Sequence, residues 1–363
     1  MKLLDCKLIW DHAEHNAFTD LQLFNGTLFL AFREGSAHVS PDGAIRILRD
    51  VKGEWQSCAL ISLPDADLRD AKLSIGPDNS LILLSAAAYQ EGPIKHQCHY
   101  WTSHDGEHWS SGTPVAEPNH WLWRITWHQS TAYGLAYGTG GTKGLFWYEW
   151  TLDGQWHYHR LEEFDNQYAN EHGLCFDESG KAYCLLRRDN KDNKITEGLW
   201  GTATPPYRDW QWQPMGFRIG GPVLIWNPNR SGFYAAYRRY EQVDQWVPQW
   251  TEVAELGMDG GVVDSLTLPS GGDCSYPGLS TDETHLNCSY YSSHEKDTSI
   301  YCSKIKIINQ KKLKPKKIFK KRIWLIVPNP NMKLYFYASR SRLTLRNLLP
   351  IYFYGAPPNT ESK

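Results

Sequence analysis

Gly26–Arg33 (GTLFLAFR), Gly180–Arg187 (GKAYCLLR) and Gly232–Arg238 (GFYAAYR) are three copies of one pattern. Each copy has a glycine suited to a tight turn, then an apolar run typical of a β-strand, then an arginine. Arg33 and Arg187 lie 154 residues apart, which is three steps of about 51, and Arg187 and Arg238 lie 51 apart. A repeat of this length predicts a row of equivalent structural units.

The same step of 51 residues finds three further copies, Ser80–Ser85 (SLILLS), Thr131–Tyr137 (TAYGLAY) and Leu286–Tyr291 (LNCSYY). A repeat of roughly 50 residues, rich in short strands, is the length of a four-stranded propeller blade. The sequence therefore predicts an all-β fold, a six-bladed β-propeller over residues 1–307, with these segments as second strands. A pair of β-sandwiches is the alternative, but a sandwich has no reason to repeat every 51 residues.

A turn motif supports the blade interpretation. Ser103–Trp109 (SHDGEHW) has the S-x-D-G-x-x-W form of an Asp-box, or BNR, turn that closes an outer hairpin. The aspartate ties down the turn and the glycine supplies a positive φ. Partial versions at a similar phase are expected at Ser40–Gly43 (SPDG), Thr151–Gly154 (TLDG) and Met258–Gly260 (MDG).

Bulk composition narrows the function. The chain carries 17 Trp, 20 Tyr and 12 Phe, a load that suits strands and sugar-binding surfaces. Its formal charge of −2 conceals a net −16 over residues 1–297, so the body is not expected to bind nucleic acid. The start, MKLLDCKLIWDH, has a short, broken apolar stretch unlike a secretion signal, and no apolar run reaches the roughly 18–20 residues of a membrane span.

The eight cysteines are far apart and form no C-x-x-C motif. We therefore expect reduced, structural thiols in a cytoplasmic protein, with neither a metal site nor a cofactor. The sequence gives no oligomeric state. Residues 308–363 follow the last copy of the repeat, and the stretch 304–322 holds ten basic residues and no acid. We expect a basic tail outside the propeller, either disordered or loosely docked, or an ending foreign to the evolved domain.

The repeat also places polar residues on the propeller axis. The start of an innermost strand and the end of its hairpin partner lie at the same end of a blade. The starts of the six first strands carry Asp20, Asp70, Arg124, Glu171, Arg218 and Tyr276, and the ends of second strands add Arg33, Arg187 and Arg238. Because an acidic body that gathers arginines on its axis suits an anionic ligand, we predict an acidic carbohydrate as the partner.

At these residues the chain resembles the sialidase (neuraminidase) superfamily, six-bladed propellers with Asp-box repeats. The resemblance covers roughly residues 10–307. It implies that Tyr276 in GDCSYPGL is the nucleophile, that Glu171 in NEHGL activates it, and that Arg187 is one arginine of the carboxylate clamp. It also implies that Asp70 in LRDAKL is the pocket aspartate of the second blade.

The sequence departs from the family pattern in the clamp and in the acid. The family's first clamp arginine lies in an F-R-I-P motif of blade one, where this chain has Phe18, Thr19, Asp20 and Leu21. Arg218, in F-R-I-G-G-P of blade five, or Arg238 could substitute for a missing clamp arginine. The acid/base aspartate should follow the hairpin of the first blade, where Asp42 stands within the turn SPDG.

Three functions remain open at this point. The first is a retaining exo-glycosidase for sialic acid or a related acidic sugar, in which a neutral phenol attacks an anionic substrate without like-charge repulsion. The second is a glycan-binding propeller that has lost the reaction. The third is a propeller lyase or hydrolase for another acidic saccharide. A complete Tyr276–Glu171 pair with an acid within reach would favour the enzymes.

Overall fold

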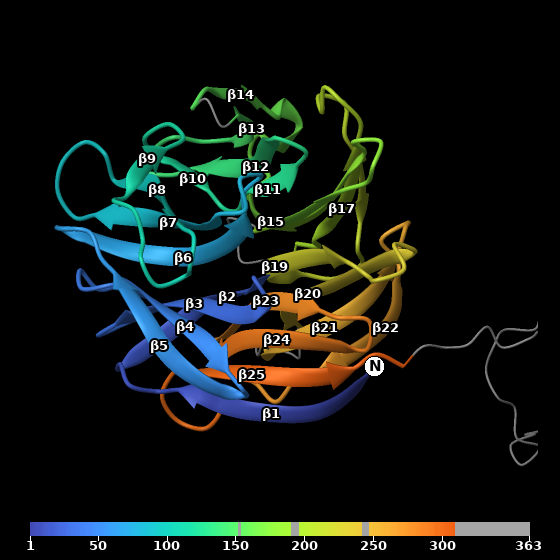
Figure 1. The fold of residues 1–363 in the computed structure, drawn as a ribbon. Helices are drawn as coiled ribbons and strands as arrows, with labels where there is room; N and C mark the ends of the chain where they lie inside the picture. The colour runs from blue at the N-terminus through green and yellow to red at the C-terminus, as the bar shows by residue number, and fades with distance from the viewer. Residues whose placement is uncertain (152–153, 190–195, 242–246, 309–363) are drawn as a thin grey trace, which may run out of the picture. The chain divides into compact units, whose positions relative to one another are not determined.

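The computed structural model describes residues 1–151, 154–189, 196–241 and 247–308, and the predicted tail lies outside them from residue 309 onward. The described residues form 25 strands in six antiparallel sheets, together with the single-turn 3-10 helix η1 (Glu162–Phe164). The sheets are arranged around one axis as the blades of a propeller, so the predicted six-bladed β-propeller is confirmed (Figure 1).

In the first three blades the strands run in sequence from the axis to the rim. Blade one contains β2 (His15–Phe24), β3 (Thr27–Gly35), β4 (Ala44–Val51) and β5 (Glu54–Ile61). Blade two contains β6 (Ala66–Ile75), β7 (Leu81–Tyr89), β8 (His96–Ser103) and β9 (Thr113–Val115). In blade three the innermost position is split between two short strands, and the blade contains β10 (His120–Leu122), β11 (Thr126–His128), β12 (Thr131–Gly138), β13 (Leu145–Thr151) and β14 (Trp156–Arg160).

The last three blades follow the same plan. Blade four contains β15 (Ala169–Phe176), β16 (Ala182–Arg188), β17 (Leu199–Ala203) and β18 (Gln211–Pro214). Blade five contains β19 (Ile219–Trp226), β20 (Gly232–Tyr240), β21 (Gln249–Gly257) and β22 (Val262–Thr267). Blade six contains β23 (Cys274–Thr281), β24 (His285–Ser292), β25 (Ser299–Lys306) and, at its rim, the N-terminal strand β1 (Lys2–Trp10).

The six copies of the repeat all fall on second strands, as the period predicts: β3, β7, β12, β16, β20 and β24. Residues 2–10 also belong to the propeller, because β1 pairs with β25 along its length and completes blade six. One detail differs from the prediction. The turn Ser40–Gly43 joins a second strand to a third, β3 to β4, whereas Ser103–Trp109 and Met258–Gly260 join third strands to fourth.

Apolar layers between neighbouring blades make up the core. One layer joins Phe29 and Ile45 of blade one to Leu68 and Leu83 of blade two, and equivalent layers continue around the ring. Gly278 of β23 allows the innermost strands of blades six and one to approach closely, because a Cβ there would lie 2.1 Å from the Leu21 nitrogen. None of the described residues forms a helix that is long and apolar enough to cross a bilayer.

Several innermost strands have a break in their pairing register, close to the end of the strand that carries the predicted site residue. In β6, β15 and β23 the irregularity falls between Arg69 and Lys72, between Ala169 and His172, and between Ser275 and Gly278. A bulge of this kind bends the strand and redirects a side chain, and such bulges recur beside active sites. In this propeller the bulges turn side chains from several blades toward the axis.

Candidate active site

The axial bulges hold two of the predicted site residues in an uncommon backbone conformation. Asp70 and Tyr276 have φ angles of 54° and 47°, in the left-handed region that residues with a Cβ seldom adopt. Strain of this kind costs about 1–3 kcal/mol per residue and concentrates at functional sites. The bulges therefore point to the axis as the functional centre.

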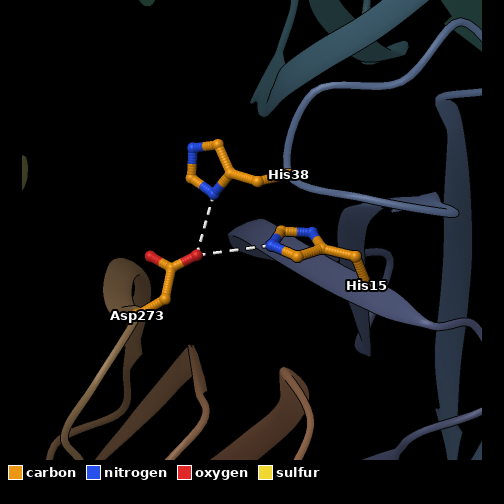
Figure 2. Close-up of side chains that lie close together, drawn as sticks. All are labelled: His15, His38 and Asp273. Atoms are coloured by element: carbon orange, nitrogen blue, oxygen red, sulfur yellow. Dashed lines mark hydrogen bonds and ion pairs between the residues drawn. The ribbon is translucent and has the colours of Figure 1, made fainter.

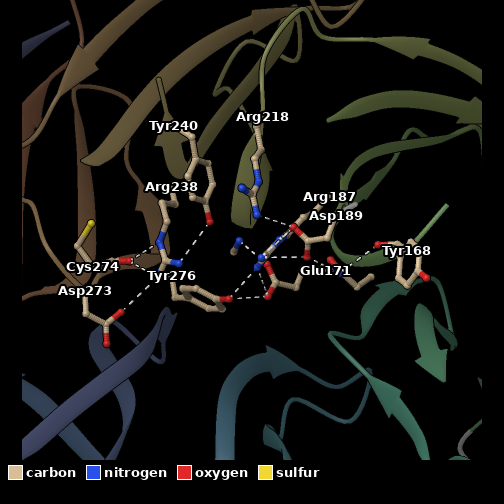
Figure 3. A network of polar contacts seen from close by, with 12 residues as sticks. Tyr168, Glu171, Arg187, Asp189, Arg218, Arg238, Tyr240, Asp273, Cys274 and Tyr276 are labelled. Carbon is tan, nitrogen blue, oxygen red and sulfur yellow. Dashed lines mark hydrogen bonds and ion pairs between the residues drawn. The ribbon is translucent and has the colours of Figure 1, made fainter. Parts of the chain in front are cut away.

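Tyr276 and Glu171 meet on the axis from blades six and four (Figure 3). The Tyr276 hydroxyl donates a hydrogen bond of 2.6 Å to Glu171 Oε1, which is the contact expected from the sequence. Glu171 Oε2 accepts a 2.6 Å hydrogen bond from the backbone N–H of Gly221 in blade five. The carboxylate is thus fixed between three blades, with one oxygen aimed at the phenol.

Arg187 completes this contact. Its Nη1 donates to Glu171 Oε1 at 2.7 Å and to the Tyr276 oxygen at 2.9 Å. Burial, followed by the negative charge of Glu171, raises the pKa of the Tyr276 phenol well above its usual value. The phenol therefore stays protonated until a base removes its proton, and Glu171 is the carboxylate in hydrogen-bond contact with it.

Two further arginines lie beside this group, as predicted. Arg218 stacks over the Tyr240 ring at 4.3 Å, and Arg238 lies over the Tyr276 ring at 4.8 Å. The Arg238 guanidinium also donates to the Cys274 carbonyl oxygen at 2.5 and 2.8 Å. The structure thus brings Arg187, Arg218 and Arg238 together around Tyr276.

A carboxylate that sequence reasoning missed lies between two of these arginines. Asp189 Oδ1 accepts hydrogen bonds from Arg187 Nη2 at 3.1 Å and from Arg218 Nη2 at 2.8 Å (Figure 3). Asn170 donates to its other oxygen at 2.9 Å. The available signal was the spacing Arg187-x-Asp189, which places both side chains on one face of the extended chain. Asp189 therefore bridges the two arginines and neutralises part of their charge.

Asp20 and Arg124 bind each other. Arg124 Nη1 and Nη2 donate to Asp20 Oδ2 and Oδ1 at 2.9 and 3.0 Å, a bidentate pair that joins blade three to blade one. Asp20 Oδ2 also accepts from the Leu73 N–H of blade two at 2.8 Å, and the Asp20 side chain is only 2% exposed. Both residues were predicted to bind substrate, and both instead cross-link the innermost strands.

Arg33 differs from the expectation that it faces the axial pocket with the other arginines. Its side chain is fully buried, and its Nε donates to Asp67 at 2.7 Å. Its Nη1 donates to the Ala37 carbonyl oxygen and its Nη2 to the Ser40 hydroxyl, at 2.8 and 2.9 Å. With every nitrogen engaged inside the protein, Arg33 has none left for a ligand.

Asp42 lies in an exposed position on the β3–β4 loop. Its carboxylate accepts hydrogen bonds from the Ser36 backbone N–H at 3.0 and 3.2 Å and from the Ser36 hydroxyl at 3.1 Å. A hydrogen bond from Ser40, with those from Ser36, lowers the pKa of Asp42. A general acid needs a raised pKa, so these surroundings oppose that role for Asp42.

The pKa of Asp70 is shifted in the opposite direction from that of Asp42. Burial raises the pKa of Asp70 to about 6, with Lys72 opposing the shift and Glu171 adding to it. Its Oδ1 is buried without a hydrogen-bond partner among the residues that the structure describes. Burial likewise lowers the pKa of Lys72 to about 8, and its ammonium lies 4.5 Å from the Trp123 ring centroid. Asp70 therefore has the protonation behaviour that an acid catalyst requires near neutral pH.

A cavity of about 280 Å³ opens between blades three and four, next to Asp189. Asp189 and Asn170 form part of its wall, and its aromatic lining comes from Tyr137, Phe164 and Tyr168. Aromatic faces with a few polar groups are typical of small-ligand sites. The cavity is large enough for part of a small saccharide next to the axial residues.

Comparison with solved structures matches this architecture. A protein of unknown function from Dyadobacter fermentans superposes with a TM-score of 0.71 at 16% identity, over 85% of this chain and 99% of that one. The α-L-arabinanase of Penicillium chrysogenum superposes with a TM-score of 0.62 at 11% identity, over 83% and 98%. The sialidase of Trypanosoma rangeli superposes with a TM-score of 0.57 at 10% identity, over 80% of this chain and 55% of the sialidase.

The chain shares its six-bladed propeller fold with these structures. No protein-family profile and no curated sequence matches the chain. At identities of 10–16% the likeness establishes the shared fold alone, and the side chains on the axis must carry any functional argument.

One group at the rim of the site could hold a metal ion, although the sequence gave no sign of one. His15, His38 and Asp273 each offer a ligand atom, and these atoms lie within 4.8 Å of one another. The three residues come from the start of β2, the β3–β4 loop and the loop before β23, so only the folded propeller assembles them (Figure 2).

Proposed function

We propose that this protein is a retaining exo-glycosidase whose nucleophile is Tyr276. The observation that carries the proposal is the 2.6 Å hydrogen bond from the Tyr276 hydroxyl to Glu171, made on the axis by residues 105 positions apart in the sequence. The φ of 47° at Tyr276 supports it, because strained backbone concentrates at functional sites.

The proposed reaction has two steps. In the first, the Tyr276 oxygen attacks the anomeric carbon, its proton passes to Glu171, and Asp70 gives its proton to the leaving glycosidic oxygen. In the second, water attacks the anomeric carbon, the carbon–Tyr276 bond breaks, and Glu171 returns the proton to the phenol while Asp70 takes one from the water. The two displacements on one carbon retain its configuration. Arg187 would steady the phenolate-like oxygen at 2.9 Å.

The resemblance to sialidases favours sialic acid or a related acidic sugar as the substrate. Arg187, Arg218 and Arg238 supply positive charge around Tyr276, and burial makes charge-assisted hydrogen bonds stronger than they are in water. An acidic ligand would have to displace Asp189 from the pair Arg187 and Arg218 in order to use both.

A second candidate, a glycosidase for a neutral sugar, follows from Asp189. Because this carboxylate already neutralises the arginine pair, a neutral substrate needs no displacement. A neutral sugar would also remove the reason for a phenol nucleophile, since no substrate charge would repel Glu171. Glu171 would then attack directly, and Tyr276 would only position it.

The experiment that tests both candidates is a hydrolysis screen of purified protein with 4-methylumbelliferyl α-sialoside and 4-nitrophenyl α-L-arabinofuranoside. Hydrolysis of the sialoside that disappears in Y276F supports the first candidate. Hydrolysis of the arabinofuranoside that disappears in E171Q but survives in Y276F supports the second. Sugar binding by calorimetry without any turnover would instead favour a glycan-binding propeller, and the proposed reaction would be wrong.

A further inference from the structure

The group formed by His15, His38 and Asp273 is arranged around one carboxylate oxygen. Asp273 Oδ2 lies 2.8 Å from His38 Nδ1 and 3.3 Å from His15 Nε2 (Figure 2). Ligand atoms held at ~2.1 Å from a single ion are separated by roughly 3.0–3.4 Å in octahedral or tetrahedral sites. The two spacings to Asp273 Oδ2 differ from that range by at most a few tenths of an ångström, and all three ligand atoms lie within 4.8 Å of one another.

Asp273 is held so that this oxygen stays available. Its other oxygen, Oδ1, accepts a 2.7 Å hydrogen bond from the Tyr291 hydroxyl, and its backbone N–H donates to the Ser293 hydroxyl at 2.9 Å. The carboxylate is the form of an aspartate that binds metal ions.

The loop that carries His38 is also fixed in place, by Arg33 and Asp42. Buried Arg33 holds the loop through Ala37 and Ser40, and Asp42 closes it by accepting hydrogen bonds from Ser36. This explains why a fully buried arginine stands at the end of β3. A loop tied at both sides of His38 presents the imidazole in one place, although its side chain is 53% exposed.

His15 is positioned by packing. Its side chain is only 10% exposed, and its ring lies 6.3 Å from the Phe18 ring and 6.4 Å from the Tyr291 ring, measured between centroids. Phe18 also contacts the His38 ring edge-on at 5.2 Å and the Tyr276 ring at 5.3 Å. One aromatic ring thus separates the histidine group from the proposed nucleophile.

Two imidazoles and one carboxylate are a ligand set of divalent transition metals. Sites with three protein ligands of this kind bind Zn²⁺ or Fe²⁺ and leave coordination positions open to water or to an oxygen of a ligand. We propose that His15, His38 and Asp273 bind one divalent transition-metal ion beside the axial residues, with its open positions available to hydroxyl or carboxylate oxygens of a sugar. The hydrolytic reaction proposed above does not depend on this ion.

The positive charge of Arg238 should weaken metal binding. Its Nη2 lies 3.6 Å from Asp273 Oδ1, so a metal cation bound by Asp273 would be repelled by the nearby guanidinium. We therefore expect a micromolar dissociation constant for Zn²⁺, weaker than in a site with more carboxylates.

Calorimetric titration of chelator-treated full-length protein with ZnCl₂ at pH 7.5 tests the proposal. One ion should bind per chain, and H38A should weaken binding by at least ~10-fold, the usual penalty for a disturbed site. Because His38 is on an exposed loop, H38A should fold normally, which far-ultraviolet circular dichroism would verify.

The matched control is H157A, which removes an exposed histidine from the rim strand β14. It should bind Zn²⁺ as the wild-type protein does. Absence of saturable binding to the wild-type protein would overturn the proposal. So would equal affinities for the wild-type protein, H38A and H157A, because that result would indicate scattered surface histidines.

Discussion

Arg33 and Arg187 both lie near the ends of second strands, yet they end in different surroundings. Arg33 pairs with Ala17 just before the bulge of β2, whereas Arg187 lies opposite the bulge of β15. Arg33 is fully buried because blade two supplies a partner, Asp67, 34 residues later. At the equivalent junction, 31 residues after Arg187, blade five supplies a second arginine, Arg218. An arginine that meets an acid forms a closed pair, whereas one that meets another arginine must find its carboxylates elsewhere.

Arg187 pairs with the carboxylates of Glu171 and Asp189, and its side chain remains 13% exposed. Arg238 is intermediate, because the acid that follows it by 35 residues, Asp273, lies 3.6 Å away and shares its other oxygen with two histidines. The charge at each blade junction, more than the arginine itself, therefore determines whether the repeat yields a structural cross-link or a site.

The largest effect that separates the two regions should come from E171Q. The amide cannot take the Tyr276 proton, nor can it attack a sugar, so both candidate mechanisms lose about 10³-fold in kcat. The measurement is kcat on whichever glycoside the screen identifies. D67N, which disturbs the Arg33 pair instead, is the matched control and should keep most of the activity per folded molecule. Near-normal turnover by E171Q would contradict any catalytic role for the axial group.

R33M tests whether Arg33 stabilises the fold. It leaves the buried Asp67 carboxylate with only Arg69 as a partner, which should cost about 3 kcal/mol of unfolding free energy. Chemical denaturation measures this loss. R187M should cost less stability, because buried Glu171 keeps hydrogen bonds from the Tyr276 hydroxyl and the Gly221 N–H, and Asp189 is 28% exposed to water, while activity falls sharply. The assignment of Arg33 to structure would fail if R33M were the more stable of the two.

The sequence was sufficient for the architecture because the repeat depends on spacing alone. Turn glycines and apolar runs recur at one period, and each copy became a second strand. The repeat was also sufficient to bring Tyr276 and Glu171 together, because it places both at the starts of innermost strands, whereas their proposed roles come from the resemblance to sialidases. Roles that depend on a partner could not be predicted, since Asp67 closes off Arg33 and Asp189 fills the arginine pair.

A subtler effect is expected from D189N. The amide keeps the shape of the junction but removes the charge that neutralises Arg187 and Arg218, so an acidic sugar should bind ~10-fold more tightly. Calorimetry with N-acetylneuraminic acid measures the change, with arabinose as the neutral comparison. If D189N left acidic-sugar affinity unaltered, this arginine pair would not be a carboxylate clamp.

The smallest effect concerns pH. The raised pKa of Asp70, about 6, means that the protonated acid is present below pH 6 and is lost as the pH rises through that value. Activity should therefore halve near pH 6 and decline further above it. A kcat/KM profile measures this limb, which D70N should abolish along with most of the activity. D42N should retain the limb, because the lowered pKa of Asp42 leaves it ionised throughout this range.

Pairing between β1 and β25 closes the ring of blades, and we call this junction the seam. Five blades are each formed from one continuous stretch of chain, whereas the sixth depends on pairing between Lys2–Trp10 and β25, nearly 300 residues away. No covalent bond closes this seam, so if β1 detaches, the backbone edge of β25 is uncovered and can accept a strand from another copy. Exchange of β1 between copies would change the assembly while leaving the axial residues, which lie on other strands, in place.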